Sequence, residues 1–102
     1  MEIKHKLISN NLHIYLYGEL DECSSHKTRK VLDELIDDNR FAISITFNLS
    51  GLSFMDSTGI GMFLGRYKKI KNYKIPVFIT GTNSVIDKIL EISGIYTIIP
   101  KK

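Results

Sequence analysis

The apolar residues of this chain switch between two spacings along its length, and this switching limits the folds open to it. Leu12, Ile14 and Leu16 alternate with polar or aromatic residues, as in a half-buried strand, and residues 43–49 alternate again. Between these segments, apolar residues from 31 to 36 recur on one face of a helix. Strand patterns and helix patterns then alternate to the end of the chain, which is typical of a layered α/β domain.

We therefore expect one domain over residues 1–102, with a single mixed β-sheet of four to five strands packed against helices. The turn-like Asn10-Asn11 predicts that the first two strands are antiparallel. The expected strands are residues 3–9, 12–17, 42–49, 75–80 and 96–99. The expected helices run from a cap at Ser24 or Ser25 to a left-handed stop at Asn39, from Ser57 to Lys71, and from Val85 to a stop at Gly94.

The composition excludes several kinds of protein. The chain is 43% hydrophobic and 25% charged, as ordinary globular domains are. It has no apolar run near the ~20 residues that cross a bilayer, and its N-terminus lacks the apolar middle of a signal peptide. Its one cysteine, Cys23, can form neither an internal disulfide nor a metal site alone. We expect a cytoplasmic protein that uses no metal or cofactor and contacts no membrane.

Five basic residues gather near the end of the second expected helix, in a chain of net charge +3. Cations at a helix C-terminus complement the helix dipole without any partner. We therefore expect a solvated helix end and no direct contact with nucleic acid. The five residues are Arg66, Lys68, Lys69, Lys71 and Lys74.

The segment S-F-M-D-S-T-G-I-G-M-F-L-G, residues 53–65, joins a strand pattern to a helix pattern and holds the candidate site. Asp56 is expected to cap the helix, with its carboxylate accepting a hydrogen bond from the backbone N–H of Thr58 or Gly59. Ser57 then lies in the first turn, where the helix dipole and unpaired N–H groups favour a phosphate.

Along the same helix, Ser57, Gly61 and Gly65 recur every four residues and share one face. Each interior glycine destabilises a helix by roughly 1 kcal/mol relative to alanine. One interpretation is that a partner approaches the bare backbone, with Met62 as an adaptable apolar contact. The alternative is that another loop or the first helix packs there. The face expected to pack on the core consists of Ile60, Phe63, Leu64, Tyr67 and Ile70.

A serine at a strand-to-helix turn also suggests a serine hydrolase that uses Ser57. However, Met55 occupies the first glycine position of the G-x-S-x-G pattern, and all three histidines precede the serine. Nucleotide-binding motifs are also incomplete, because Leu64 stands where G-x-G-x-x-G needs its third glycine. A phospho-aspartate receiver, with Asp56 as acceptor beside the acidic residues 21–22, is a further hypothesis.

Three parts of the chain resemble one protein family. Residues 18–21, G-E-L-D, resemble a motif that follows the family's second strand. The run S-F-M-D-S-T-G-I-G, followed by L-G-R-Y-K-K-I, resembles its phosphorylation loop and helix, and S-G-I-Y-T-I-I resembles its closing segment. The whole chain is thus similar to bacterial anti-sigma-factor antagonists with the STAS fold (sulfate transporter and anti-sigma-factor antagonist), especially the sporulation branch that serves sigma F.

This resemblance implies a protein that regulates transcription through a change of binding partners and that catalyses no reaction. The family's phosphorylated serine corresponds to Ser57, directly after the aspartate, with Thr58 as a rival acceptor. The implied partner is an anti-sigma factor that is also an ATP-dependent serine kinase. Unphosphorylated antagonist binds this kinase and releases the sigma factor, phosphorylation breaks the complex, and a serine phosphatase of the PP2C type resets it. A general-stress antagonist of another anti-sigma kinase is the alternative within the family.

The resemblance also suggests residues around the phosphorylation site. Glu19 and Asp21 are candidates for partner contact, with a solvated or loop-supporting role as the alternative. Many family members continue into another C-terminal helix after the position of Lys102, which implies an exposed sheet or helix face at that end. The residues expected to support the cap and phosphosite are Asp56, Thr58 and Gly59, and those expected to bind the partner are Glu19, Asp21, Ser57, Gly61, Met62 and Gly65.

Overall fold

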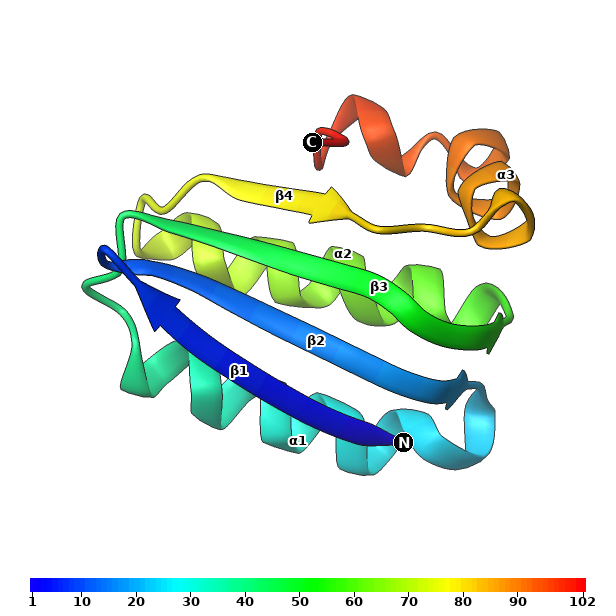
Figure 1. The fold of residues 1–102 in the computed structure, drawn as a ribbon, viewed down its shortest axis with the longest axis horizontal. Helices are drawn as coiled ribbons and strands as arrows, with labels where there is room; N and C mark the ends of the chain where they lie inside the picture. Colours follow the sequence, from blue (N-terminus) through cyan, green and yellow to red (C-terminus); the bar gives the residue numbers. More distant parts are fainter.

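The computed structural model describes all of residues 1–102, and its elements alternate as the sequence predicts. Three helices and four strands are joined by short connections (Figure 1). The elements are β1 (Glu2–Ile8), β2 (Asn11–Leu20), α1 (Glu22–Asp38), β3 (Ser44–Met55), α2 (Ser57–Asn72), β4 (Val77–Thr80), α3 (Ser84–Ser93) and a short 3₁₀ helix (Ile95–Thr97).

The four strands form one mixed sheet in the order β1-β2-β3-β4. β1 and β2 are antiparallel, as predicted, and are joined by a tight turn at Ser9 and Asn10, whose φ angles of 48° and 63° are left-handed. β3 lies parallel to both β2 and β4. The predicted single mixed sheet packed against helices is therefore confirmed.

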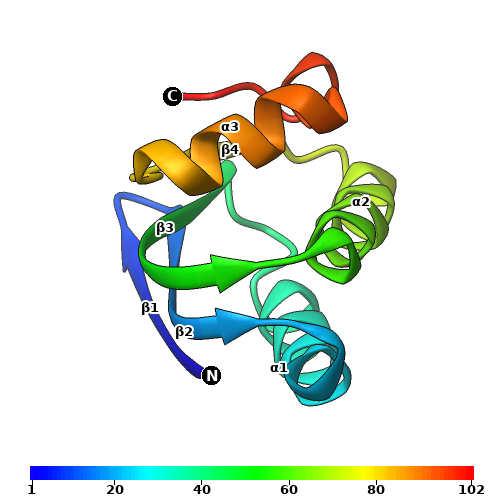
Figure 2. The same cartoon turned by 90° about the vertical axis from the view of Figure 1, so that its right-hand side faces the viewer.

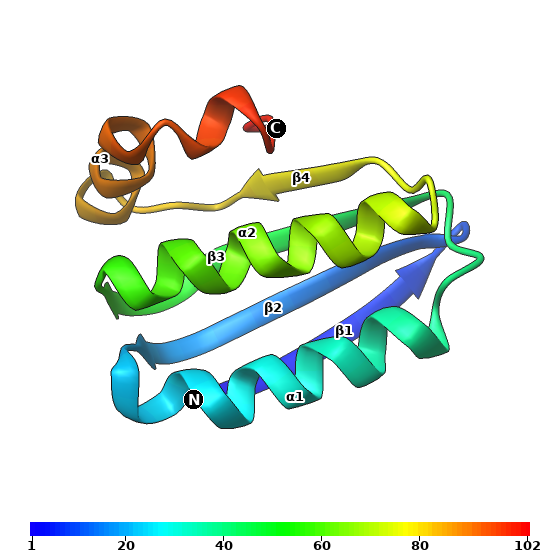
Figure 3. The same cartoon turned by 180° about the vertical axis from the view of Figure 1, so that it is seen from behind.

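Two helices cover one face of this sheet and leave the other face without a helix. Figure 3 shows α1 and α2 side by side across the covered face, whereas Figure 1 shows the strands in front. The alternating Leu12, Ile14 and Leu16 of β2 are fully buried beneath the helices. Phe47 of β3 meets Phe63 of α2 edge to face, with ring centroids 5.4 Å apart. None of the helices is both long and apolar enough to cross a membrane.

Ion pairs join the two covering helices, so part of the basic cluster is not the solvated helix end that we expected. Arg66 is only 9% exposed, and its Nε lies 2.8 Å from Asp33 Oδ1 of α1. Lys69 Nζ lies 3.0 Å from Asp37 Oδ1, which also accepts a hydrogen bond from the Tyr73 hydroxyl at 2.6 Å. The hydrogen bond from Tyr73, which has the larger effect, and the hydrogen bond from Lys69 both lower the pKa of Asp37. The remaining three lysines of the cluster are exposed, as predicted.

The predicted N-cap of α1 is wrong, and the predicted stop at Asn39 is correct in position but not in conformation. Its N-cap is Asp21 and not Ser24 or Ser25. Ser24 instead completes a capping box, in which its backbone N–H donates to Asp21 Oδ1 at 2.9 Å and its Oγ accepts from Asp21 N–H at 3.1 Å. At the other end Asn39 has a φ of −118° and so is not left-handed, and its side-chain amide donates to Leu35 O at 2.8 Å.

Two expected strands also differ from the structure. The strand expected at 42–49 begins at Ser44 and continues through residues 50–55, because this segment pairs with the end of β2. Residues 96–99 form no strand, since hydrogen bonds back to Gly94 and Ile95 wind them into the 3₁₀ helix and the turn after it. Strand-like pairing there is limited to one parallel bridge between Ile79 and Lys101. The predicted stop at Gly94 is confirmed, and the structure shows that this C-cap residue is left-handed, with a φ of 80°.

Candidate phosphorylation and partner-binding site

The three parallel strands all end at one edge of the sheet, and each leads into a helix there. Figure 2 looks onto this edge: β2 and β3 run into the N-termini of α1 and α2, and α3 crosses above them. The three helices have polar N-cap residues, Asp21, Asp56 and Asn83, whose side chains each accept a backbone hydrogen bond. The edge thus gathers three helix N-termini, the ends that favour negative charge.

Ser57 is the first residue of α2 and its side chain is exposed at this edge. The carboxylate of Asp56 accepts a hydrogen bond from Thr58 N–H at 2.9 Å, which confirms the predicted cap. No hydrogen bond of the structure involves the Ser57 hydroxyl, whereas Thr58 is half-buried. The hydroxyl that is easier to reach from solvent is therefore that of Ser57.

Pairing between β2 and β3 brings the G-E-L-D segment beside the serine loop. Asp56 N–H donates to Leu20 O at 3.3 Å, and Glu19 lies opposite Phe54 in the parallel register. Glu19 is exposed, and Phe54 exposes 49% of its surface beside it. Phe54 is not among the partner-binding residues expected from the sequence. The available signal is an aromatic residue two positions before the cap Asp56.

Asp21 has a structural role in the same loop. Its carboxylate is engaged in the capping box of α1, and Ser24 Oγ also donates to Glu19 O at 2.8 Å. These bonds fix the path of the chain between β2 and α1. The geometry thus supports the loop-supporting alternative for Asp21, while Glu19 extends freely from the edge.

The three glycines of α2 fall into two classes. Gly59 is buried, and a Cβ there would overlap Met55 Cγ and lie 2.9 Å from Met55 Sδ and 3.1 Å from Leu20 Cδ2. Only glycine therefore lets the first turn of α2 approach the strand ends so closely. In contrast, a Cβ at Gly61 or Gly65 would meet nothing within 4 Å. The alternative that a loop or α1 packs on these two glycines is wrong, and this backbone faces open space.

The expected contact at Met62 is wrong, because this residue is 1% exposed. Close packing at Gly59 fixes the rotation of α2 about its axis, and Met62 then lies three residues along the same buried side. Arg66, four residues further on, pairs with α1, so this side faces α1. The core face is consequently shifted, and three residues expected in the core are only half-buried: Ile60, Leu64 and Tyr67.

The alternatives that make Ser57 or Asp56 part of an enzyme or receiver gain no support from this geometry. None of the three histidines is hydrogen-bonded to Ser57. The structure has no group of three or more His, Cys, Asp or Glu side chains that could hold a metal ion. The carboxylates of Asp21 and Asp56 are both used as helix caps.

Comparison with known proteins agrees with this architecture. The family model described as "STAS domain" matches residues 2–102. The chain belongs to the STAS-domain family. Within the family it is 37% identical over 87 residues to the anti-sigma F factor antagonist of Paenibacillus polymyxa, covering 85% of this chain and 74% of that protein. It is also 28% identical over 102 residues to the anti-sigma-B factor antagonist of Listeria monocytogenes, covering 100% of this chain and 87% of that protein.

A solved structure shows the same fold. The Bacillus cell fate determinant SpoIIAA in its phosphorylated form superposes on this STAS domain with a TM-score of 0.70 and 24% identity, covering 99% of this chain and 91% of that one. At this identity the likeness establishes the fold. The relatives named above include antagonists from both the sigma F and the sigma B systems.

Proposed function

We propose that this STAS protein is an anti-sigma-factor antagonist whose binding is switched off by phosphorylation of Ser57. The observation that carries the proposal is the exposed Ser57 hydroxyl at the first position of α2, beside the Asp56 cap. The 37% identity to an anti-sigma F factor antagonist supports it. In this proposal the unphosphorylated protein binds an anti-sigma serine kinase in the cytoplasm and so releases a sigma factor. A PP2C-type phosphatase resets the switch, and the antagonist catalyses no step.

Local electrostatics are sufficient for such a switch. A phosphate on Ser57 adds about −1.5 to −2 charges at pH 7. The N-terminus of α2 can stabilise this charge, so the domain should stay folded. An interface closed over a neutral hydroxyl would instead enclose a dianion beside the Asp56 carboxylate. A buried, unpaired charge at an interface costs about 2–5 kcal/mol, or roughly 30- to several-thousand-fold in affinity.

The surface proposed to meet the kinase surrounds Ser57. It includes the open backbone at Gly61 and Gly65, where a partner can approach α2 without meeting a side chain. Glu19 and the exposed ring of Phe54 extend this surface onto the strand ends. Aromatic side chains are enriched in protein–protein interfaces relative to the rest of the surface. Asp21 contributes mainly by holding the loop.

The first experiment is to incubate the protein with a candidate anti-sigma kinase and Mg-ATP and to map phosphate by peptide mass spectrometry. We expect one phosphate on Ser57 and none on Ser57→Ala, with Thr58→Ala as a matched control that is still modified. Phosphate on Thr58 would move the site by one residue and refute the assignment to Ser57. An absence of phosphate, with a kinase active on another substrate, would refute that kinase as the partner.

The second experiment measures kinase affinity by isothermal titration calorimetry. Wild type and Ser57→Ala should bind alike, and Ser57→Asp should bind at least 30-fold more weakly, at the lower end of the range given above. Equal binding of Ser57→Asp would contradict a charge-based switch. Parallel titrations with a sporulation kinase and a general-stress kinase decide between the sigma F pathway and the general-stress alternative.

A further inference from the structure

The face of the sheet that has no helix carries a row of lysines beside a row of tyrosines. Lys4 of β1 lies opposite Tyr15 in the antiparallel register with β2. Because side chains alternate along a strand, Lys6 and Tyr17 project from this same face, away from the buried side of β2. These four residues and His5 line a hollow of about 500 Å³, which we call the β1–β2 hollow. Figure 1 shows β1 and β2 at the edge of the sheet away from α3 and the C-terminal segment.

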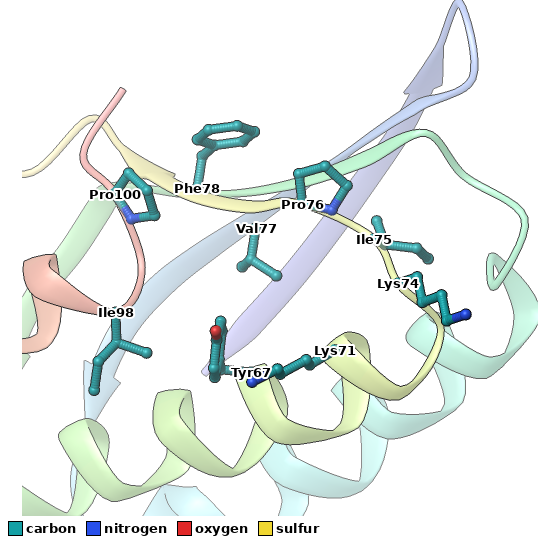
Figure 4. A pocket seen from close by; sticks show the side chains of 9 residues that line it. All are labelled: Tyr67, Lys71, Lys74, Ile75, Pro76, Val77, Phe78, Ile98 and Pro100. Atoms are coloured by element: carbon teal, nitrogen blue, oxygen red, sulfur yellow. The ribbon is translucent and has the colours of Figure 1, made fainter.

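The two sides of the sheet can be distinguished directly on β4. Figure 4 shows Val77 directed toward α2 and Phe78 on the other side of the strand. The pocket drawn there, of about 400 Å³, lies between α2 and β4 and includes Ile98 and Pro100 of the C-terminal segment. The β1–β2 hollow shares no residue with this pocket and includes no part of the C-terminal segment.

The ring of Tyr17 is held against β3 by a glycine. Tyr17 lies beside Gly51 in the parallel register, and a Cβ at Gly51 would overlap Tyr17 Cδ1 and lie 2.8 Å from Cε1. Any other residue at position 51 would therefore push the ring off the strand. The tyrosine is still 36% exposed. The hollow thus contains a ring that the neighbouring backbone positions and that solvent can reach.

The two lysines of the hollow have no carboxylate partner. None of the three ion pairs of the structure involves Lys4 or Lys6, and Glu2, the acidic residue of β1, forms no ion pair either. Instead, Lys4 Nζ lies 5.7 Å from the centroid of the Tyr17 ring, and Lys6 Nζ lies 6.0 Å from that of Tyr15. Cation–π contacts at exposed sites are weak, so an anion can draw both ammonium groups away from the rings.

The repeat of the two rows indicates the chemistry of the ligand. Lys4 and Lys6 are separated by one residue, as are Tyr15 and Tyr17, which corresponds to about 7 Å along each strand. A single-stranded nucleic acid carries one phosphate and one flat base on every nucleotide, so it can offer successive phosphates to the lysines and successive bases to the rings. An acidic peptide would meet the lysines but would offer no bases for stacking. A duplex hides the faces of its bases.

We propose that the β1–β2 hollow binds single-stranded nucleic acid, with two successive phosphates at Lys4 and Lys6 and their bases stacked on Tyr15 and Tyr17. The expectation of no nucleic-acid contact rested on the basic end of α2, which lies on the other face of the sheet (Figure 3). The proposed site is separate from the phosphorylation switch, because Ser57 begins α2 and does not line the hollow.

The test is a titration of the full chain with fluorescein-labelled octathymidylate, followed by fluorescence anisotropy and mapped by ¹H–¹⁵N NMR. Saturable shifts should be confined to β1, β2 and the adjoining part of β3. Two phosphate contacts predict a slope of about −1.4 for log K against log salt concentration. Lys4→Gln and Lys6→Gln should each reduce the size of this slope by about 0.7. Lys30→Gln, a matched change of an exposed lysine on α1, should leave it unchanged.

Stacking is tested separately from charge. Tyr17→Leu should weaken binding at least fivefold, the lower end of the range for one stacked base, whereas Tyr17→Phe should keep the affinity of wild type. Phe41→Leu removes a ring that is 79% exposed outside the hollow, and it should have no effect. Far-ultraviolet circular dichroism checks the fold of each variant, and Tyr15→Leu provides the same test at the neighbouring ring.

Four results would overturn the proposal. Saturable shifts could be absent at 50 mM salt, or Lys30→Gln could lose as much affinity as Lys4→Gln, which would indicate non-specific attraction to a basic protein. Octaglutamate could bind as tightly as octathymidylate, which would assign the hollow to acidic protein segments. Thymidine monophosphate could bind as tightly, which would exclude a site for a nucleic-acid strand. None of these results affects phosphate mapping on Ser57, so the two proposals fail separately.

Discussion

Alanine substitution at three glycines of α2 provides a sharp test of how this helix is placed. At Gly61 and Gly65 an added Cβ meets nothing within 4 Å, so the main effect is the higher helix propensity of alanine. Each variant should therefore raise the free energy of unfolding by about 1 kcal/mol. At Gly59 the same gain is opposed by overlap with the buried Met55 and close contact with Leu20.

The expected size of the contrast follows from these contacts. Overpacking a closed site costs about 1–3 kcal/mol. With a central cost of about 2 kcal/mol and a propensity gain of about 1 kcal/mol, Gly59→Ala should be about 1 kcal/mol less stable than wild type. Gly59→Ala and Gly61→Ala, the same substitution two residues apart, should thus differ by about 2 kcal/mol.

Urea unfolding followed by far-ultraviolet circular dichroism measures these differences, and calorimetry gives an independent midpoint. For a domain of this size, 1 kcal/mol corresponds to a shift of about 4–8 °C. Equal stability of Gly59→Ala and Gly61→Ala would refute the argument that Gly59 fixes the rotation of the helix. The more stable Gly61→Ala and Gly65→Ala should nevertheless bind the kinase more weakly, and undiminished binding would remove these glycines from the proposed interface.

Three further predictions concern single side chains outside the proposed partner-binding surface. Hydrogen bonds to its carboxylate, above all from Lys101 and then from Tyr96, lower the pKa of Asp87 to about 2, below its ordinary 3.8. The stability that it contributes should therefore be complete above about pH 4 and disappear as the pH falls to about 2, and Asp87→Asn should flatten this part of a urea-derived pH–stability curve. Asp33→Asn should destabilise the domain by about 1–3 kcal/mol, because it leaves the buried Arg66 unpaired, and Arg66→Met in the same chain should restore most of the loss in chemical denaturation. Met62→Ala should lower stability by about 2–5 kcal/mol without changing kinase affinity, whereas a loss under about 1 kcal/mol in the same assay would contradict its burial.

Features encoded by neighbouring residues could be predicted from the sequence. The alternation at Leu12, Ile14 and Leu16 predicted the buried face of β2, because side chains of a strand point to opposite sides at every step. The cap of Asp56 on Thr58 and the helix stop at Gly94 depend only on residues within one turn, and the sequence predicts both correctly. The motif around Ser57 also led to the STAS family, which the comparisons confirm.

Features that depend on distant segments could not be predicted in this way. Residues 50–55 look like a turn by composition, yet they are a strand because β2 offers hydrogen-bonding partners more than 30 positions earlier. Residues 96–99 look like a strand, yet local hydrogen bonds after Gly94 wind them into a 3₁₀ helix and the turn that follows.

The sequence alone therefore determined the order of the four strands and three α-helices up to Gly94, the capped start of α2 and the position of Ser57 within it. Only the tertiary structure decided which side of α2 is buried, since contact of Gly59 with Met55 and of Arg66 with Asp33 turns Met62 inward. Helical periodicity defines the relative angles of side chains, but the absolute rotation of a helix is set by what packs against it. For this reason the partner-binding surface proposed from the structure differs from the one expected from the sequence. It excludes Met62, includes Phe54 beside Glu19, and retains the open backbone at Gly61.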